Sequence, residues 1–306
     1  MRDAFVKVLL QEMEHNRRLV LITGDLGFGV LRPVWERFPD QILNAGIAEQ
    51  GMVSMAAGLA KTDRTVVVYS IGNFPSLRPL EQIRNDCAYH EANVKIVCVG
   101  GGFVYGSLGM SHHATEDLSI LRALPGVTCL APGDPAEAEW TTREALRMKG
   151  TCYLRLGRGN EPKVHGEPIP GWRIPEAITL RRGEDIAILS CGGILTQAAE
   201  AAELLDRRGI RAEVVSFPCL KPLDAGRVRE LLGRFRHILT VEENNILGGF
   251  GGAVCEIAAE EGSGCRITRI GLKDTYSTVV GSQAYLRKVY GMDAEAIAGK
   301  AEELLK

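Results

Sequence analysis

The chain has 306 residues, and its 36 lysines and arginines nearly balance its 38 aspartates and glutamates. This near-neutral charge gives no broad electrostatic reason to bind nucleic acid or an anionic membrane surface. No apolar run approaches the roughly twenty residues of a membrane-spanning helix, and the charged, amphipathic N-terminal stretch does not read as a secretory signal, so we expect a cytoplasmic protein.

Short apolar runs alternate with longer amphipathic stretches along the first half of the chain. The runs are typical of buried strands, and the stretches around 49–61, 77–90 and 134–147 are typical of helices. This alternation predicts a mostly parallel sheet with helices on both faces, and ligands of such sheets bind beyond the carboxyl ends of the strands. The strand-like runs are LVLITGD, TVVVYS, VKIVCVG, GVTCLAP and TCYLRLG.

The stretch from Glu161 to Pro175 interrupts this alternation with four prolines and two glycines, a composition typical of a linker. A second, smaller α/β unit follows, with the strand-like runs DIAILSCG, AEVVSF, HILTVEE and CRITRIG and with helical stretches near 194–208, 224–235 and 250–261. We therefore predict two doubly wound α/β domains, over residues 1–160 and 178–306, joined by a linker over 161–177.

The stretch NAGIAEQGMVSMAAGLA places one carboxylate, Glu49, at the start of an otherwise apolar helix. At about 100° per residue, Met52, Val53 and Ala56 form one apolar stripe, and Glu49 falls at its N-terminal end. We therefore expect Glu49 to point inward, where a carboxylate must be paired with a cation or carry a proton, as a general acid or base does. Its position alone fits equally well an acid that the helix dipole favours in a first turn.

Other strand-like runs end in segments rich in glycine, aspartate, serine or histidine. Asp25 follows the first run, in a glycine-rich segment that has neither the GxGxxG nor the GxxxxGK[ST] spacing of a nucleotide loop. His112 and His113 are adjacent, so both cannot face one ligand from a strand. We expect one catalytic histidine here rather than two metal ligands, with a solvated loop histidine as the alternative.

Arginines follow two of the strand-like runs, and their planar fork suits a phosphate because it donates two parallel hydrogen bonds. Arg155 and Arg158 lie near the end of the fifth run, and Arg78 and Arg84 lie after the second. A surface salt bridge is the alternative for each of them. Phe74, in the same segment as Arg78, fits either a core ring or a stacking platform for a heterocycle.

Five segments occur in the order and approximate spacing of the C-terminal half of transketolase: GIAEQ, YSIGNFPSLRPLEQIRND, LGMSHHATED, RLGRGN and EENNILGGFGG. The chain resembles the pyrimidine-binding and C-terminal domains of that family over nearly its whole length. It is similar to the split transketolases, in which these two domains form a separate subunit. The resemblance implies an enzyme that uses thiamine diphosphate to transfer a two-carbon ketol unit from a ketose phosphate to an aldose phosphate.

The resemblance also implies roles for individual residues. Glu49 matches the family's glutamate that hydrogen-bonds the aminopyrimidine ring of the cofactor and relays a proton to it. Phe74 lies about where the family places an aromatic ring against the aminopyrimidine, and Asp25 aligns with an acidic residue near the cofactor. His112 matches the histidine that contacts the substrate and its developing oxyanion, although the segment GMSH also allows a register that selects His113.

Three arginines resemble residues that bind substrate phosphate in this family. Arg158 matches the arginine at the phosphate end of the substrate, and Arg78 resembles one used by the related 1-deoxyxylulose-5-phosphate synthases. Arg2 stands where transketolases have another phosphate contact. A second substrate histidine that the family carries before His112 is absent, since this chain reads GGGFVYGS there.

The chain lacks the family's diphosphate module, in which a GDG segment and a later NN motif bind Mg²⁺ and the cofactor diphosphate. The resemblance therefore implies a separate N-terminal subunit that binds the diphosphate and Mg²⁺, with the cofactor shared across the interface and no metal site in this chain. It implies an α2β2 assembly, and a homodimer of this chain also fits.

Other functions fit some of these features. The β subunit of a 2-oxoacid dehydrogenase decarboxylating component also carries an IAEQ-type motif and a GGFG segment, and a 1-deoxyxylulose-5-phosphate-synthase-like enzyme shares the arginine pattern. From another class, a non-catalytic binding module that kept the fold is a third hypothesis. Turnover that depends on Glu49 would separate the enzymes from the binding module.

Overall fold

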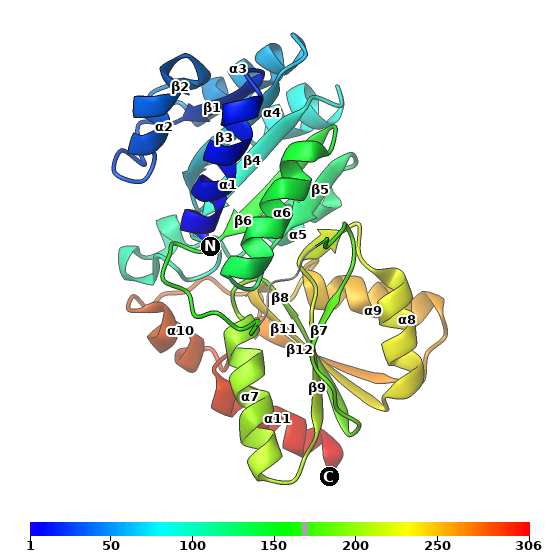
Figure 1. Ribbon diagram of the computed structural model, residues 1–306. Helices are drawn as coiled ribbons and strands as arrows, with labels where there is room; N and C mark the ends of the chain where they lie inside the picture. Colours follow the sequence, from blue (N-terminus) through cyan, green and yellow to red (C-terminus); the bar gives the residue numbers. More distant parts are fainter. Residues whose placement is uncertain (167–170) are drawn as a thin grey trace.

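The computed structural model describes residues 1–166 and 171–306, which form two α/β domains that lie end to end (Figure 1). Each domain is built on a mostly parallel sheet, as the alternation of strand-like and helical stretches predicts. Part of the predicted linker 161–177, residues 167–170, lies outside the described residues. Within the described ranges, no helix is long and apolar enough to cross a membrane.

The sheet of the first domain has seven strands in the order β10-β5-β6-β4-β3-β1-β2. Its strands are β1 (Leu19–Thr23), β2 (Ile42–Asn44), β3 (Thr65–Ile71), β4 (Val94–Val99), β5 (Val127–Leu130), β6 (Thr151–Leu156) and β10 (Cys219–Lys221). All neighbours pair in parallel except β10, which comes from the second half of the chain and pairs antiparallel with β5. The two domains therefore share a strand, in addition to side-chain contacts.

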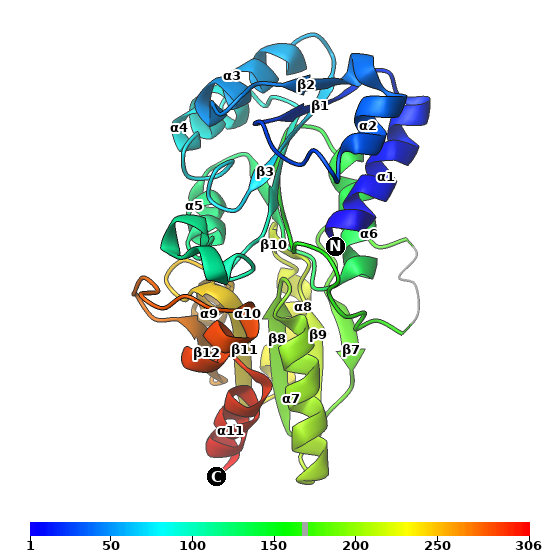
Figure 2. The ribbon, with the colours of Figure 1, turned by 90° about the vertical axis from the view of Figure 1, so that its left-hand side faces the viewer.

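Helices cover both faces of this sheet (Figure 2). One face packs against α1 (Arg2–His15), α2 (Arg32–Arg37) and α6 (Pro135–Arg147), and the other against α3 (Glu49–Ala60), α4 (Leu80–Gln82), the π-helical segment Ile83–Ala88 and α5 (Asp117–Ala123). Three short 3₁₀ turns span Pro39–Gln41, Gly106–Leu108 and Met110–His112. Because both faces are covered, β1 and β4 are buried along their whole length, and their sequences are continuous apolar runs rather than alternating ones.

The sheet of the second domain has five strands in the order β12-β11-β8-β9-β7. Its strands are β7 (Ile178–Arg181), β8 (Ile186–Cys191), β9 (Ala212–Ser216), β11 (His237–Asn245) and β12 (Arg266–Leu272). Its helices are α7 (Leu195–Arg207), α8 (Ala225–Arg234), α9 (Phe250–Glu260), α10 (Gln283–Val289) and α11 (Ala294–Leu305).

The chain reverses its direction of winding in the middle of this second sheet. From β8 it passes through α7 to β9 on one side, and it later crosses to β11 on the other side of β8. In doubly wound sheets, ligands bind in the crevice at the carboxyl ends of the two strands that flank such a reversal. Here these strands are β8 and β11, and their carboxyl ends face the first domain (Figure 1).

Candidate functional site

Glu49 is the first residue of α3 and is only 6 % exposed. The residues of the predicted apolar stripe, Met52, Val53 and Ala56, are buried behind it, so the helical spacing placed the carboxylate correctly. Its Oε1 accepts a hydrogen bond of 2.8 Å from Nη1 of Arg78. Of the two states open to a buried carboxylate, the structure shows pairing with a cation.

Arg78 contacts an aromatic ring as well as Glu49. Its Cζ lies 4.1 Å from the centroid of the half-buried Phe74 ring, in the geometry of a cation–π contact. Phe74 in turn packs edge-on against His112, with the ring centroids 5.2 Å apart. We call Glu49, Phe74, Arg78 and His112 the Glu49 cluster. It lies beyond the carboxyl ends of β2, β3 and β4, where a parallel sheet binds its ligands.

Asp25 is exposed at the carboxyl end of β1, with a backbone φ of 58°. Its amide donates to Oδ1 of Asn44 at 2.9 Å, and Nδ2 of Asn44 donates back to its carboxylate at 3.0 Å. Asn44 also accepts from the amide of Gly46, just before α3. Asp25 therefore braces the turn that leads into Glu49 rather than contacting the Glu49 cluster. The sequence reasoning missed Asn44, although it opens the stretch NAGIAEQ.

The two adjacent histidines lie in different surroundings. His112 is half-buried in the Glu49 cluster, and its Nδ1 lies 3.0 Å from Oγ of Ser111. His113 is 2 % exposed, with Nε2 hydrogen-bonded to the Gly106 carbonyl and its ring edge-on to Phe103. Burial lowers the pKa of His113. The geometry thus favours His112 for contact with a substrate, and that role stays a prediction.

The arginines that the sequence assigns to phosphate fall into two places. Arg78 belongs to the Glu49 cluster. Arg158 is exposed, with Cζ 5.4 Å from the centroid of the Tyr105 ring. Arg2 pairs with Asp3 at 3.0 Å. Burial raises the pKa of Tyr105, and the positive charges of Arg158 and Arg2 oppose this shift. Tyr105 is a neighbour that the sequence reasoning did not single out.

Arg155 and Arg158 line the same cavity, but they differ in burial. Arg155 lies inside β6 with 5 % of its side chain exposed, and its Nε pairs with the fully buried Asp117 at 2.9 Å. Its Nη2 donates to the carbonyl oxygens of Ala114 and Glu243, which connects the two domains. Strand residues alternate sides, so Arg155 points into the protein while Arg158, beyond the strand, does not.

The surface around Glu49 is open and partly apolar. A shallow hollow there is lined by residues 47–51 and Arg78. Three apolar side chains of this region are exposed: Ile47 is 77 % exposed, Met55 44 % and Leu43 41 %. Of these, Ile47 lines the hollow itself. Within residues 1–166 and 171–306, no cluster of three or more His, Cys, Asp or Glu side chains could hold a metal ion.

Comparison with known proteins identifies the two domains. Residues 1–163 match the family model for the pyrimidine binding domain of transketolase, and residues 176–297 match the model for its C-terminal domain. The chain belongs to the transketolase family. Membership implies dependence on thiamine diphosphate, whose pyrimidine end the first domain binds in this family.

Three relatives match this chain over nearly their whole length, so they too consist of these two domains without a diphosphate domain. A putative transketolase C-terminal section from Methanocaldococcus jannaschii is 35 % identical over all of this chain and 96 % of its own length. One subunit of an apulose-4-phosphate transketolase from Phocaeicola vulgatus is 33 % identical over all of this chain and 97 % of its own length. The solved structure of a split gene transketolase, an inactive β4 tetramer, matches with a TM-score of 0.91 at 31 % identity, over 99 % of this chain and 97 % of that one.

The Glu49 cluster fits the pyrimidine end of the cofactor. Arg78 is a flat, delocalised group that donates a hydrogen bond to Glu49 and stacks on Phe74. An aminopyrimidine ring is also flat and requires the same two contacts, a buried acceptor and an aromatic face. The carboxylate and the ring face that Arg78 contacts are therefore groups that would also suit a flat aminopyrimidine ring.

Proposed function

We propose that this chain is the C-terminal subunit of a split transketolase, which transfers a two-carbon ketol unit from a ketose phosphate to an aldose phosphate. The observation that carries the proposal is an incomplete site. Glu49 and Phe74 offer contacts for the pyrimidine end of the cofactor, but they open onto a surface hollow rather than an enclosed pocket. The sequence holds no GDG segment with a following NN motif for the diphosphate end.

A separate diphosphate-binding subunit completes the site in this proposal and brings Mg²⁺ with it. The exposed apolar side chain of Ile47 supports this, because it lines the hollow and would be covered by that subunit. The relatives named as one subunit of an apulose-4-phosphate transketolase also support it, since such a name implies a second kind of chain. We propose an α2β2 assembly, in which two copies of this chain serve two shared sites.

Within the shared site, Glu49 holds a proton between its carboxylate and the pyrimidine ring, and Phe74 supports the face of that ring. Thiamine diphosphate, when bound, supplies the nucleophilic carbon that attacks the carbonyl of the donor. His112 lies against Phe74, where its ring can hold a hydrogen bond to the substrate oxygen that gains negative charge. Arg158, beside Tyr105, and Arg2 bind the phosphate end of the substrate.

The proposal requires Arg78 to release Glu49 when the cofactor arrives. Arg78 is 49 % exposed, so water can replace Glu49 as its partner at small cost. Once released, its guanidinium is free at the edge of the site, where it can bind a substrate phosphate, as the sequence resemblance implies. The ion pair seen here then describes the subunit before the cofactor binds.

Reconstitution with the diphosphate-binding subunit tests this function. With thiamine diphosphate, Mg²⁺, xylulose 5-phosphate and ribose 5-phosphate, the mixture should form sedoheptulose 7-phosphate, and neither chain alone should do so. A parallel reaction with apulose 4-phosphate as the donor tests the substrate named for the relatives. Turnover of a 2-oxoacid without ketol transfer would support the dehydrogenase alternative instead. Condensation of pyruvate with glyceraldehyde 3-phosphate would support a 1-deoxyxylulose-5-phosphate-synthase-like enzyme.

A further inference from the structure

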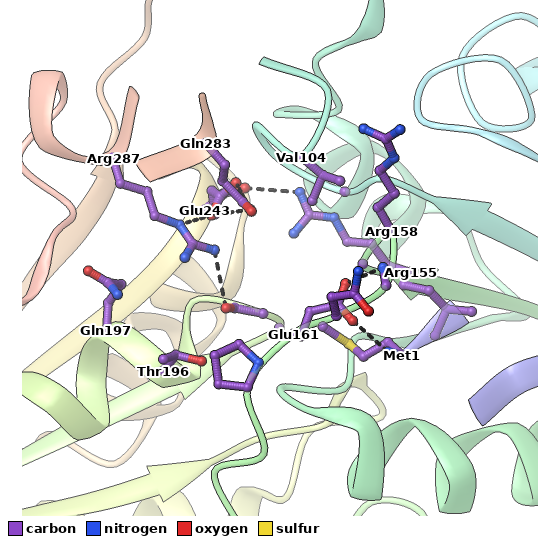
Figure 3. A pocket seen from close by; sticks show the side chains of 18 of the residues that line it. Met1, Val104, Arg155, Arg158, Glu161, Thr196, Gln197, Glu243, Gln283 and Arg287 are labelled. Atoms are coloured by element: carbon purple, nitrogen blue, oxygen red, sulfur yellow. Dashed lines mark hydrogen bonds and ion pairs between the residues drawn. The ribbon is translucent and has the colours of Figure 1, made fainter. Parts of the chain in front are cut away.

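A cavity of about 380 Å³ lies between the two domains, apart from the Glu49 cluster (Figure 3). It opens at the carboxyl ends of β8 and β11, where the winding of the second sheet reverses. Gly192 and Gly193 follow β8 there, Glu243 lies near the end of β11, and Arg155 reaches the cavity from the first domain. The cavity thus occupies the position at which a doubly wound sheet binds its ligand.

Arg155 brings an unused hydrogen-bond donor to this cavity. Its side chain is only 5 % exposed, with Nε held by Asp117 and Nη2 held by the carbonyl oxygens of Ala114 and Glu243. Its Nη1 has no hydrogen-bond partner within the described ranges, and it points into the cavity (Figure 3). This nitrogen faces the cavity, where an anion would form a charge-assisted hydrogen bond with it.

Arg287 presents a second unused donor from the opposite wall. Its Nε pairs with Glu243 at 2.5 Å, and its Nη2 donates to the carbonyl of Gly193 at 3.1 Å, which leaves Nη1 without a partner among residues 1–166 and 171–306 (Figure 3). The Glu243 carboxylate also accepts from the amide of Phe103 and from Gln283. These donors therefore stabilise the negative charge of Glu243. Arg155 and Arg287 each have one nitrogen, Nη1, that faces the cavity without a partner in the described ranges.

The start of α7 forms the floor between these two arginines. This helix has 13 residues, and no side chain caps its N-terminus. Gly192, with a φ of 81°, and Gly193 bring the backbone close to the cavity, and Thr196 lines it with a hydroxyl group. The amides of Leu195 and Gln197 already donate to backbone carbonyl oxygens, so the start of α7 offers an anion mainly its dipole and the Thr196 hydroxyl group.

Two carboxylates stand around the mouth of the cavity. Glu161 accepts from the amide of Gly159 at 2.8 Å and from the terminal amino group of Met1 at 2.6 Å, and Glu200 accepts from Gln197 at 2.9 Å. Each carboxylate oxygen keeps a further lone pair, which repels a second negative charge but accepts a hydrogen bond from a hydroxyl group. The cavity therefore suits a ligand with one anionic end and several hydroxyl groups rather than an anion with charges along its length.

We propose that this cavity is a second ligand site, which binds a small phosphorylated polyol such as a sugar phosphate. The phosphate contacts Arg155, Arg287 and the start of α7, and the hydroxyl groups face Glu161 and Glu200. Arg158 also lines this cavity, but its guanidinium lies over Tyr105 and points away from the middle of the cavity (Figure 3). Because Arg155 connects the domains, a ligand here binds both of them at once.

Titration of the full chain without its partner subunit tests the proposal, and ribose 5-phosphate, inorganic phosphate and ribose serve as probes. By calorimetry, ribose 5-phosphate should bind, inorganic phosphate should bind more weakly, and ribose should not bind. Arg287→Met should weaken the binding of ribose 5-phosphate by at least about tenfold, because it removes a charged donor. Arg182→Met is the matched control, because Arg182 is exposed, pairs with Glu213 and does not line the cavity, and it should leave this binding unchanged.

Circular dichroism will show whether Arg287→Met folds. If it does not, a second variant tests the proposal. Glu200 is exposed on α7, so Glu200→Lys should fold normally, and it should tighten the binding of both phosphates by several-fold through its added positive charge. Absence of ribose 5-phosphate binding to the wild-type chain would overturn the proposal. So would equal binding by wild type and Glu200→Lys, an equal loss in Arg182→Met and Arg287→Met, or a loss in Arg158→Ala but not in Arg287→Met, which would place the ligand at the substrate contact proposed for Arg158.

Discussion

The Glu49 cluster and the contacts around Arg155 both pair an arginine with a buried carboxylate, but they differ in how exposed the arginine is. Arg78 is 49 % exposed beside Glu49, whereas Arg155 is 5 % exposed beside the fully buried Asp117. An exposed guanidinium exchanges its partner for water at small cost, and a buried one does not. Glu49, whose partner is replaceable, is therefore the carboxylate to which we assign the proposed chemistry, and Asp117, whose partner is fixed, helps to hold Arg155 between the domains.

The substitution Glu49→Gln should have the largest effect. It keeps the shape and the hydrogen-bonding capacity of the side chain but removes the group that exchanges the proton. In the reconstituted complex, kcat should fall by about a thousandfold or more while the complex still assembles, as size-exclusion chromatography can show. Glu260→Gln, the same substitution at an exposed position of α9, is the control and should retain activity. Unchanged turnover in Glu49→Gln would reject the catalytic role and favour a non-catalytic binding module.

The substitution Asp117→Asn tests the fixed pair. It leaves Arg155 buried without a full counter-charge and also changes the partner of the Tyr153 hydroxyl group. The free energy of unfolding should fall by about 3–5 kcal/mol, measured by urea denaturation. Arg78→Ala leaves the buried Glu49 beside a hollow that water can enter, so it should lower this free energy by less, by about 1–3 kcal/mol. Equal effects of the two variants would remove the distinction between the two regions.

Glu242 is a buried carboxylate that accepts hydrogen bonds from backbone amides instead of pairing with an arginine. Its burial predicts that the stability of the protein depends on pH. Burial raises its pKa to about 7, against the hydrogen bonds from the amides of Gly251 and Phe250. The folded state therefore holds this proton more tightly than the unfolded state, so the contribution to stability is present at low pH and is lost as the pH rises through about 7. The free energy of unfolding should decline between about pH 5 and pH 8 by up to about 3 kcal/mol.

The variant Glu242→Gln is the test, because it cannot lose a proton. Its unfolding free energy, measured by urea denaturation across the same pH range, should decline less than that of the wild type. An identical pH profile for the two proteins would show that Glu242 does not cause the dependence.

Arg158→Ala should have a smaller, substrate-specific effect. Loss of a guanidinium that binds phosphate should raise KM for phosphorylated sugars by about tenfold to a hundredfold with little change in kcat. Steady-state kinetics of the reconstituted enzyme with phosphorylated and unphosphorylated donors measures the difference. A loss of the same size with unphosphorylated sugars would argue against phosphate recognition.

The smallest expected effect is that of Arg78→Ala on cofactor binding. This substitution removes the group that occupies Glu49 and Phe74 before the cofactor binds. The apparent Kd of thiamine diphosphate in the reconstituted complex should therefore fall by up to about fivefold, measured by calorimetry. A higher Kd would mean that Arg78 contributes to the cofactor site rather than competing for it.

The sequence predicts those elements whose apolar pattern shows that they are buried. β1, β3, β4 and β6 are apolar runs, and the stripe behind Glu49 predicts an inward carboxylate. β2 and β10, with three residues each, are too short to show a pattern, and β10 depends on pairing with another domain. The pairing of β2 with β1 and of β10 with β5 arises only when the chain folds.

The same limit applies to the candidate site. Residues 49 and 78 lie 29 positions apart, so the pair between Glu49 and Arg78 depends on the path of the loop after β3. The burial of Arg155 did have a signal, because it stands inside the strand-like run TCYLRLG rather than after it. Its partner Asp117, 38 positions away, had none.

The most direct test of the account is the exchange of the proton on the reactive carbon of thiamine diphosphate, followed by NMR in deuterated water. The complex of this chain with its diphosphate-binding subunit should exchange this proton much faster than free cofactor does, and this chain alone should not accelerate the exchange. The complex that carries Glu49→Gln should lose most of the acceleration. Fast exchange with this chain alone, or undiminished exchange with Glu49→Gln, would contradict the claim that Glu49 is a proton relay that works only in a shared site.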